Sequence, residues 1–257
     1  MSQHDEPAAG PARLAYHDTA FIDGTGGRPV RILAEYLGPL EALEREQIRD
    51  TVVFFGSART SADGPGAHYY EAARVLARRL SEWSLAQQCD WHRFVVCTGG
   101  GPGIMEAANR GAAEAGARSI GFNISLPFEQ DANRYISPGL SFDFHYFFMR
   151  KLWLVHTACA AVVFPGGFGT FDELFELLTL EQTGKLRSSV PVLLYGREFW
   201  SEVVNLDALV RHGMIAPEDR DRLVFVDTPD EALSALQALF VRDEDGHCLR
   251  FTGSRTK

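Results

Sequence analysis

Short apolar runs that end in glycine alternate with segments of helical spacing along most of the chain. The runs at residues 51–56 (TVVFFG) and 190–196 (VPVLLYG) are typical, because continuous hydrophobicity indicates a strand that is buried on both faces. Similar runs lie at residues 93–100, 118–124, 160–167 and 222–227. Strands that alternate with helices at this spacing predict an α/β fold, a doubly wound parallel sheet with helices on both faces.

Helices are predicted between these strands, where apolar residues recur every three or four positions. They cover residues 69–83, 103–115, 170–182, 199–211 and 230–240, and residues 141–157 begin extended and become helical. In doubly wound sheets ligands bind beyond the carboxyl ends of the strands. We therefore expect the chemistry in the loops that follow the strands.

The chain divides into one α/β domain at residues 50–241 and three flanking segments. Residues 1–29 are rich in glycine, proline, alanine and aspartate and predict a flexible tail. Residues 30–49 predict an amphipathic helix that docks on the domain or on a partner subunit, with a kink or a break at its Gly-Pro pair. Residues 242–257 are expected to form a solvated C-terminal tail.

The net charge of −9 disfavours a nucleic acid as partner, because binding its backbone needs a basic surface. A small anionic ligand is compatible with this charge, since local donors hold it. The apolar runs are too short to span a membrane and the first residues do not resemble a secretory signal, so we expect a cytoplasmic protein without membrane contact. The four cysteines share no Cys-x-x-Cys spacing, and we expect neither a disulfide framework nor a metal site.

A glycine-rich turn, TGGGPGIMEAAN at residues 98–109, lies where a predicted strand ends and a helix begins. Such a turn binds anions, because bare N–H groups and the positive end of the helix dipole point at the ligand. The dinucleotide signature Gly-x-Gly-x-x-Gly fails here, since Ile104 stands where the third glycine is needed, and no Walker lysine follows. A tight turn without a ligand is the alternative interpretation.

A second glycine turn, PGGFGTFDE at residues 165–173, also leads from a strand into a helix. The hydroxyl of Thr170 could bind a phosphate or cap the helix. The spacing of Thr170 and Glu173 also fits a capping box, in which the two side chains satisfy backbone donors reciprocally. Two glycine turns on separate strand ends of one sheet favour a shared anion site.

Arg150 lies between the two turns, in the apolar segment FFMRKLWL at residues 147–154. A lone arginine in such a segment usually extends to solvent or pairs with a carboxylate. Glu173 is a candidate partner, and the pair could be structural or catalytic.

These three segments together resemble the Lonely Guy (LOG) family of phosphoribohydrolases, which is often called lysine decarboxylase-like. The family motif Pro-Gly-Gly-x-Gly-Thr-x-x-Glu is present in full at residues 165–173. The turn at residues 98–109 and the Met-Arg-Lys at residues 149–151 match as well, and FGSAR at residues 55–59 resembles the family's turn after the first strand. The resemblance covers roughly residues 52–226.

The resemblance implies a Rossmann-like homodimer, or a higher homo-oligomer, that works without metal or cofactor. Its reaction would cleave the N-glycosidic bond of a nucleoside 5′-monophosphate and release a free base and ribose 5-phosphate. Arg150 and Glu173 match the family's catalytic pair. The positions expected to bind the substrate are Ser57, Arg59, Gly100, Gly101, Gly103, Ile104, Met105, Lys151, Gly166, Gly167, Gly169 and Thr170.

Two alternatives remain for the base of the substrate, an AMP-like purine and a cytokinin. The plant enzymes of the family that activate cytokinins have a shorter chain, a different glycine turn and a histidine at the position of Phe148. This chain is more similar to longer bacterial relatives, some of which act on ordinary nucleotides such as AMP.

Two chemical arguments limit the possible activities. Lysine decarboxylation needs pyridoxal phosphate on a lysine, and of the three lysines in the chain only Lys151 is a candidate, so we reject this activity. Cleavage of a nucleotide passes through an oxocarbenium-like ribose. We expect Glu173 to be held ionised by the helix dipole and by Arg150, and Arg150 to act as a fixed charge.

Two other functions use the same features. One is a regulatory protein that binds a nucleotide without cleaving it, although such a protein has no need of the Arg150–Glu173 pair. The other is a dinucleotide-dependent oxidoreductase, which the failed glycine signature disfavours.

Overall fold

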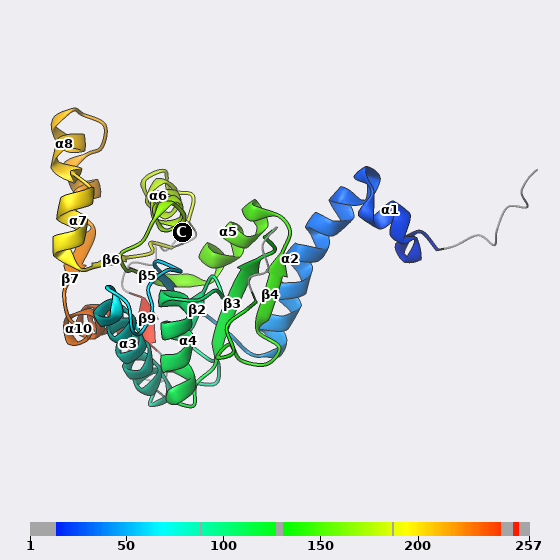
Figure 1. The fold of residues 1–257 in the computed structure, drawn as a ribbon, viewed down its shortest axis with the longest axis horizontal. Coiled ribbons are helices and arrows are strands. Elements are labelled where there is room, and N and C mark those ends of the chain that lie inside the picture. The colour runs from blue at the N-terminus through cyan, green and yellow to red at the C-terminus, as the bar shows by residue number, and fades with distance from the viewer. Residues whose placement is uncertain (1–13, 88, 127–130, 187, 243–248, 252–257) are drawn as a thin grey trace, which may run out of the picture.

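The computed structural model describes residues 14–87, 89–126, 131–186, 188–242 and 249–251, and a seven-stranded sheet lies at its centre (Figure 1). The strands are β1 (Thr51–Phe55), β2 (Val95–Thr98), β3 (Ser119–Ile124), β4 (Ser141–Phe144), β5 (Ala158–Val163), β6 (Val192–Tyr195) and β7 (Leu223–Val226). Their order is β4-β3-β2-β1-β5-β6-β7, and neighbouring strands run parallel. The predicted doubly wound, Rossmann-like α/β fold is confirmed.

The strand order reverses between β1 and β5. The chain places β1 to β4 outward on one side and then returns to add β5 on the other side of β1. At such a reversal the loops after adjacent strands diverge and leave a crevice at the carboxyl ends. The second glycine turn follows β5 directly at this crevice, whereas the first follows β2, one strand further out.

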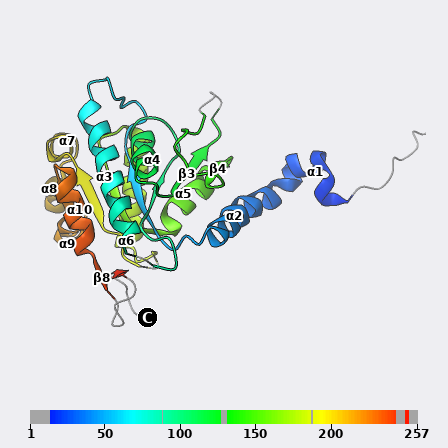
Figure 2. The same cartoon turned by 90° about the horizontal axis from the view of Figure 1, so that it is seen from below.

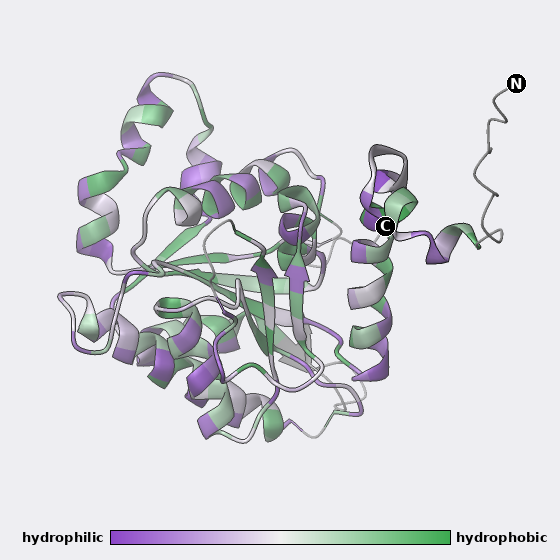
Figure 3. Ribbon diagram, turned by 45° about the vertical axis from the view of Figure 1, so that its right-hand side comes forward, coloured by the Kyte–Doolittle hydropathy of each residue, from purple (hydrophilic) through white to green (hydrophobic). Residues whose placement is uncertain are grey.

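Helices cover both faces of the sheet (Figure 2). One face packs against α3 (Ala67–Leu85), α4 (Ile104–Glu114) and α10 (Pro229–Ala238). The other packs against α2 (Arg28–Arg45), α5 (Phe147–His156), α6 (Phe168–Gln182) and α7 (Arg197–Val203). The strands β1, β2, β3, β5 and β6 are buried along their whole length. Burial on both faces explains why β1, β5 and β6 are apolar without alternation, as the hydropathy colouring of the central sheet illustrates (Figure 3).

Several elements differ from the prediction in the C-terminal part. The predicted helix at residues 199–211 is two helices, α7 and α8 (Leu206–Arg211), because the Asn205 side chain accepts the Ala208 N–H and starts a new helix. The short helix α9 (Pro217–Asp221) was not predicted. The strand β9 (Leu249–Phe251) lies in the segment that we expected to be a tail, and it pairs antiparallel with β8 (Phe240–Arg242), which begins where the last predicted helix ends.

The N-terminal segment also contains more secondary structure than its composition suggests. Where the sequence predicts a tail, the described residues form η1 (Ala15–His17), α1 (Thr19–Asp23) and η2 (Thr25–Gly27). The side chain of Asp18 caps α1 by accepting two N–H groups of its first turn. The part of the predicted tail at residues 1–13 lies outside the described residues.

The helix α2 continues through its Gly-Pro pair without a break. Pro39 lacks the N–H that would bond to the carbonyl of Glu35, four residues earlier. That carbonyl accepts the indole N–H of Trp153 on α5 instead, at 3.1 Å. The Glu35 carboxylate accepts two N–H groups at the start of α5, so this part of α2 docks on the domain. The first half of α2 and α1 extend away from the sheet (Figure 1).

Within the described residues, each helix is too short or too polar to cross a membrane.

Candidate active site

A cavity of about 920 Å³ opens at the carboxyl ends of β1, β2 and β5, where the strand order reverses. Its size lies in the range of small-molecule sites. Eight of the residues predicted to form the site line it: Ser57, Arg59, Met105, Arg150, Gly167, Gly169, Thr170 and Glu173. The other six do not: Gly100, Gly101, Gly103, Ile104, Lys151 and Gly166.

Arg150 and Glu173 form a buried ion pair in the wall of this cavity. Nη2 of Arg150, on α5, donates to Oε1 of Glu173, on α6. The two side chains are only 14% and 6% exposed. The ring of Phe147 lies against the guanidinium, with its centroid 5.2 Å from Cζ. The predicted pairing of Arg150 with Glu173 is therefore present in the fold.

Two polar atoms of this pair lack a hydrogen-bond partner in the part of the chain that the structure describes. Oε2 of Glu173 and Nε of Arg150 are both buried and make no hydrogen bond to the described residues. A buried polar atom without a partner costs roughly 1–3 kcal/mol, and more when it is charged. Such atoms are usually satisfied by a ligand or water. Glu173 lines the cavity, so its carboxyl group lies in the wall beside any bound substrate.

The pKa of Glu173 is raised to about 7, which contradicts our expectation of a carboxylate held ionised. Burial is the largest cause, because it disfavours the charged form. Arg150 and Lys151 on α5 lower the pKa, while Glu176 and Asp172 on α6 raise it, and burial outweighs the attraction. Glu173 can therefore exchange a proton near neutral pH, as a general acid or base must.

The N-terminus of α6 provides backbone donors at the same cavity. The helix begins at Phe168 after Gly167, and no side chain caps it. Its first N–H groups lack intrahelical acceptors. At Gly167 and Gly169 the space that a β-carbon would occupy is open, so an anion can approach the backbone closely. Thr170, which lies inside α6, adds a hydroxyl.

The capping box is excluded as an explanation of Thr170 and Glu173. Both residues lie within α6, and the position before the helix is occupied by Gly167. Gly166 lies behind the turn, where a β-carbon would come within 2.0 Å of Thr170 Oγ1 and 3.0 Å of the Ser57 backbone nitrogen. Glycine at this position therefore lets the turn pack directly against the loop after β1.

The first glycine turn contributes to the cavity only through Gly99 and Met105. At the start of α4, the Ile104 N–H donates to the Ser57 carbonyl at 3.1 Å, so the loop after β1 occupies this helix end. Residues of both glycine turns line this cavity, but the glycines at 100, 101 and 103 are buried behind its wall. Their contribution to binding stays a prediction.

Sequence analysis did not single out some residues of the cavity wall. Gly99 and Phe168 lie inside the two glycine motifs, so the motifs contain a signal for them. Leu154 and Phe171 also line the cavity. They are apolar positions of amphipathic helices, and the sequence pattern does not distinguish a cavity wall from the core.

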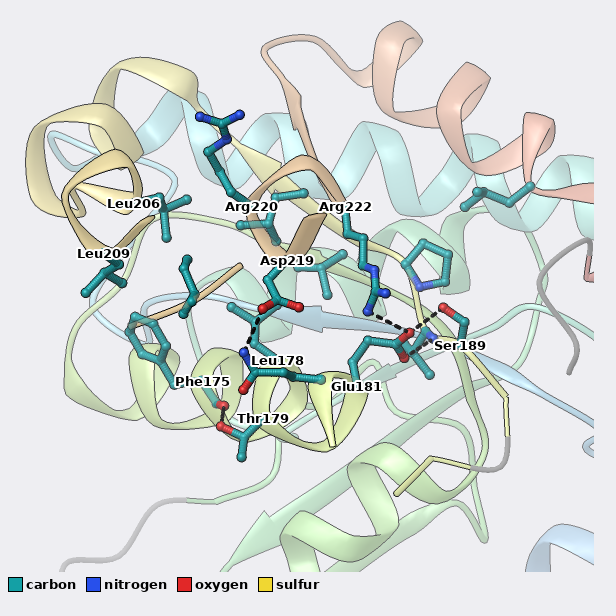
Figure 4. Close-up of a pocket in the computed structure, with 17 residues that line it drawn as sticks. Phe175, Leu178, Thr179, Glu181, Ser189, Leu206, Leu209, Asp219, Arg220 and Arg222 are labelled. Carbon is teal, nitrogen blue, oxygen red and sulfur yellow. Dashed lines mark hydrogen bonds and ion pairs between the residues drawn. The ribbon is translucent and has the colours of Figure 1, made fainter. Parts of the chain in front are cut away.

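A second cavity, of about 380 Å³, lies along the C-terminal half of α6, beside β6, α8 and α9 (Figure 4). Several polar groups in its wall bond to one another. Gln182 Nε2 donates to Asp219 Oδ2 at 2.7 Å, and Ser189 Oγ donates to Glu181 Oε1 at 2.7 Å. These groups are satisfied within the protein, so the larger cavity is the candidate active site.

Comparison with known proteins identifies the family. Residues 105–236, just over half of the chain, match the family model described as "Possible lysine decarboxylase". The chain belongs to this family, the LOG family. A cytokinin riboside 5′-monophosphate phosphoribohydrolase of Arabidopsis thaliana (LOG3) is 26% identical over 199 residues, which are 77% of this chain and 86% of the relative. A probable enzyme of the same name from Oryza sativa subsp. japonica (LOGL6) is 27% identical over 205 residues, 79% of this chain and 76% of the relative.

Solved structures share the fold of this LOG-family chain. The structural-genomics target TM1055 has a TM-score of 0.52 at 21% identity, and the match covers 74% of this chain and 99% of that chain. A molybdenum cofactor binding protein of Rippkaea orientalis has a TM-score of 0.52 at 18% identity, with 74% and 96% covered. At these identities the likeness shows the architecture alone.

The lysine in the LOG-family Met-Arg-Lys segment does not fit the chemistry in the name of the family model. Lys151 Nζ lies 2.8 Å from Asp172 Oδ2 and 3.1 Å from Glu176 Oε2, outside the wall of the large cavity. Burial lowers the pKa of Lys151, but the two carboxylates outweigh burial and raise it above its ordinary value. A Schiff-base lysine needs a neutral amine. Lys151 is thus unsuited to carry pyridoxal phosphate.

Proposed function

We propose that this LOG-family protein acts in the cytoplasm and hydrolyses the N-glycosidic bond of a nucleoside 5′-monophosphate. The substrate is an AMP-like nucleotide or a cytokinin riboside monophosphate, and the products are the free base and ribose 5-phosphate. One observation carries the proposal: the buried Arg150–Glu173 pair and the N-terminus of α6, which no side chain caps, line one cavity. The names of the plant relatives support the reaction class.

The 5′-phosphate binds at the N-terminus of α6 in this proposal. The N–H groups of the first turn of α6 and the Thr170 hydroxyl are its donors, and the helix dipole favours its negative charge. Ser57 and Arg59, from the loop after β1, line the same cavity and add a hydroxyl and a guanidinium. Phosphate binding fixes the ribose and supplies binding energy remote from the bond that breaks.

Glu173 transfers the proton of the reaction in this proposal. When the C1′–N bond breaks, its electron pair goes to the nitrogen of the base and positive charge develops on the ribose. A water molecule attacks C1′, Glu173 accepts a proton from this water, and the proton then passes to the departing base. A pKa of about 7 suits both steps. Arg150 stays charged and holds the carboxyl in place.

A base-release assay tests this proposal. The purified protein is incubated with a panel of nucleoside monophosphates and with the matching nucleosides, and the free bases are separated by chromatography. We expect at least one monophosphate to be cleaved, and its nucleoside to react slower by about 100-fold or more, because the phosphate-binding energy is lost. Equal rates for nucleotide and nucleoside would contradict the phosphate site.

Two binding measurements distinguish the alternative functions. Calorimetric binding of a monophosphate without release of any base would favour the regulatory nucleotide-binding protein. Saturable binding of NAD(P)H would favour the oxidoreductase.

We also infer that the protein forms a homodimer through the outer surface of α5 and α6. Large apolar side chains are exposed there, namely Phe148, Leu152, Phe168 and Phe175. Exposed apolar patches of this kind mark interaction sites. Light scattering after size exclusion should give a dimer for the natural protein and a monomer for Leu152→Glu. A monomeric natural protein at micromolar concentration would contradict this inference.

A further inference from the structure

A buried polar network holds the first glycine turn in place. Asn109, on α4, is fully buried, and its Oδ1 accepts the Thr98 hydroxyl at 2.7 Å. Its Nδ2 donates to the Ile120 carbonyl on β3 at 3.3 Å. The Thr98 hydroxyl oxygen accepts the Gly100 N–H at 2.9 Å. The network therefore joins β2, β3 and α4 to the turn.

Asn133 completes the network from the segment between β3 and β4. Its backbone N–H donates to the Gly100 carbonyl at 2.8 Å. Its Nδ2 lies 3.1 Å from the carbonyl oxygens of both Gly100 and Gly101, and 2.9 Å from Asn109 Oδ1. One side chain thus holds two successive carbonyls of the turn.

The held turn lies beside the arginine of the site. A β-carbon on Gly99 would be 2.9 Å from Met105 Sδ and 3.8 Å from Arg150 Nη1, so the backbone at Gly99 is next to the guanidinium. Gly100 has a φ of +74°, and a β-carbon there would be 3.4 Å from Cβ of Asn123. The turn has little room to move while the network is intact.

We propose that Asn133 and Asn109 are positioning residues that hold the Gly99–Gly101 turn against Arg150, and that Arg150 in turn orients the carboxyl of Glu173. This inference rests on the proposed function. Because Arg150 lies beside the turn and pairs with Glu173, a displaced turn changes the geometry of the pair. A misplacement of about 1 Å can lower a reaction rate on the order of 100-fold.

Substitutions at both ends of the network test the inference. In Asn133→Ala the Gly101 carbonyl loses its donor and the Gly100 carbonyl keeps only the backbone N–H of residue 133. We expect kcat to fall about 10- to 100-fold while KM changes less than about threefold, since the phosphate site on α6 is untouched. Thr98→Val breaks the network from the other end with little change in shape and should have the same effect. Thr98→Ser keeps the hydroxyl and should restore most of the rate.

Ser137→Ala is the matched control. The Ser137 hydroxyl oxygen accepts the Ser119 N–H at 2.9 Å, in the same segment as Asn133 but without contact to the turn. We expect this variant to have the kcat of the natural protein.

A titration of Glu173 separates positioning from a general loss of structure. The charged groups that act on it are Arg150 and Lys151 from α5 and Asp172 and Glu176 from α6. When Arg150 moves away, the carboxylate loses its main attraction and its pKa rises further. The midpoint of its ¹³C-carboxyl NMR titration, assigned with a Glu173→Gln variant, should rise by about half a unit or more in Asn133→Ala and Thr98→Val.

The titration needs no substrate, so its result is independent of the proposed reaction. An unchanged midpoint in folded Asn133→Ala, or an equal rise in Ser137→Ala, would overturn the positioning role. Failure of the natural protein to cleave any nucleoside monophosphate would overturn the proposed function. The titration would still test whether the network positions Arg150.

Discussion

The two glycine turns have similar sequences and different surroundings. Each follows a buried strand and begins a helix. In the turn at residues 98–103, the carbonyls of two glycines accept from Asn133 and the first N–H of α4 donates to the Ser57 carbonyl. In the turn at residues 165–170, α6 begins without a side-chain cap and its glycines at 167 and 169 face open space. The first turn is closed by the protein, and the second is open to a ligand.

Strand order explains this difference better than local sequence. The open turn follows β5, at the reversal of strand order, where the loop after β1 packs against Gly166 and leaves Gly167 and Gly169 facing open space. The closed turn follows β2, and the chain that leaves β3 folds back over it through Asn133. A glycine-rich helix N-terminus is thus an anion site only where the rest of the fold leaves its donors unoccupied.

The largest expected effect is at Glu173, on the helix that the open turn begins. Glu173→Gln keeps the size of the side chain but removes its ability to accept a proton. We expect kcat to fall about 100-fold or more, the usual loss for a general acid or base, while calorimetry shows nucleotide affinity within about threefold of the natural protein. Turnover close to that of the natural protein would place the chemistry elsewhere in the cavity.

The stability of the protein should depend on pH through the same residue. Its pKa is raised from 4.5 to about 7 in the folded protein, so the folded state binds the proton more tightly than the unfolded state. The resulting stabilisation is complete below pH 4.5 and is lost as the pH rises through 7, by at most about 3 kcal/mol. Glu173→Gln should lack this loss. The free energy of unfolding of the variant, measured with denaturant, should therefore increase relative to that of the natural protein as the pH rises from 5 to 8. Parallel pH profiles for the two proteins would contradict the raised pKa.

A pair of glycine substitutions compares the two turns directly, and its effects should be the smallest. Gly100→Ala places a side chain at a φ of +74° in the closed turn and should lower the free energy of unfolding by about 1–2 kcal/mol. Gly167→Ala has a φ of −97° and open space, so its stability should change by less than about 0.5 kcal/mol. Its methyl group enters the proposed phosphate site and should raise KM about tenfold. If Gly167→Ala lost stability and kept its KM, the turn at residues 165–170 would serve the fold and would not bind the phosphate.

Much of the fold could be predicted because burial on both faces leaves a clear pattern. Continuous hydrophobicity predicts the strands between residues 51 and 227, and the spacing of apolar residues predicts the helices between them. The pairing of Arg150 with Glu173 was also predicted, since a lone arginine in an apolar helix needs a carboxylate. The helix boundaries were harder to predict. The start of a new helix at Asn205 and the continuity of α2 each depend on a single hydrogen bond.

The amino-acid sequence by itself determined the parallel sheet, the two turns and the identities of the charged pair, because these follow from local hydrophobicity, glycine content and motif. Only the tertiary structure decided which turn is open, how far burial raises the pKa of Glu173, and that Asn133 holds a turn about thirty residues away. The physical reason is that solvation and hydrogen-bond partners depend on which segments the strand order brings together. A short stretch of sequence does not contain that information.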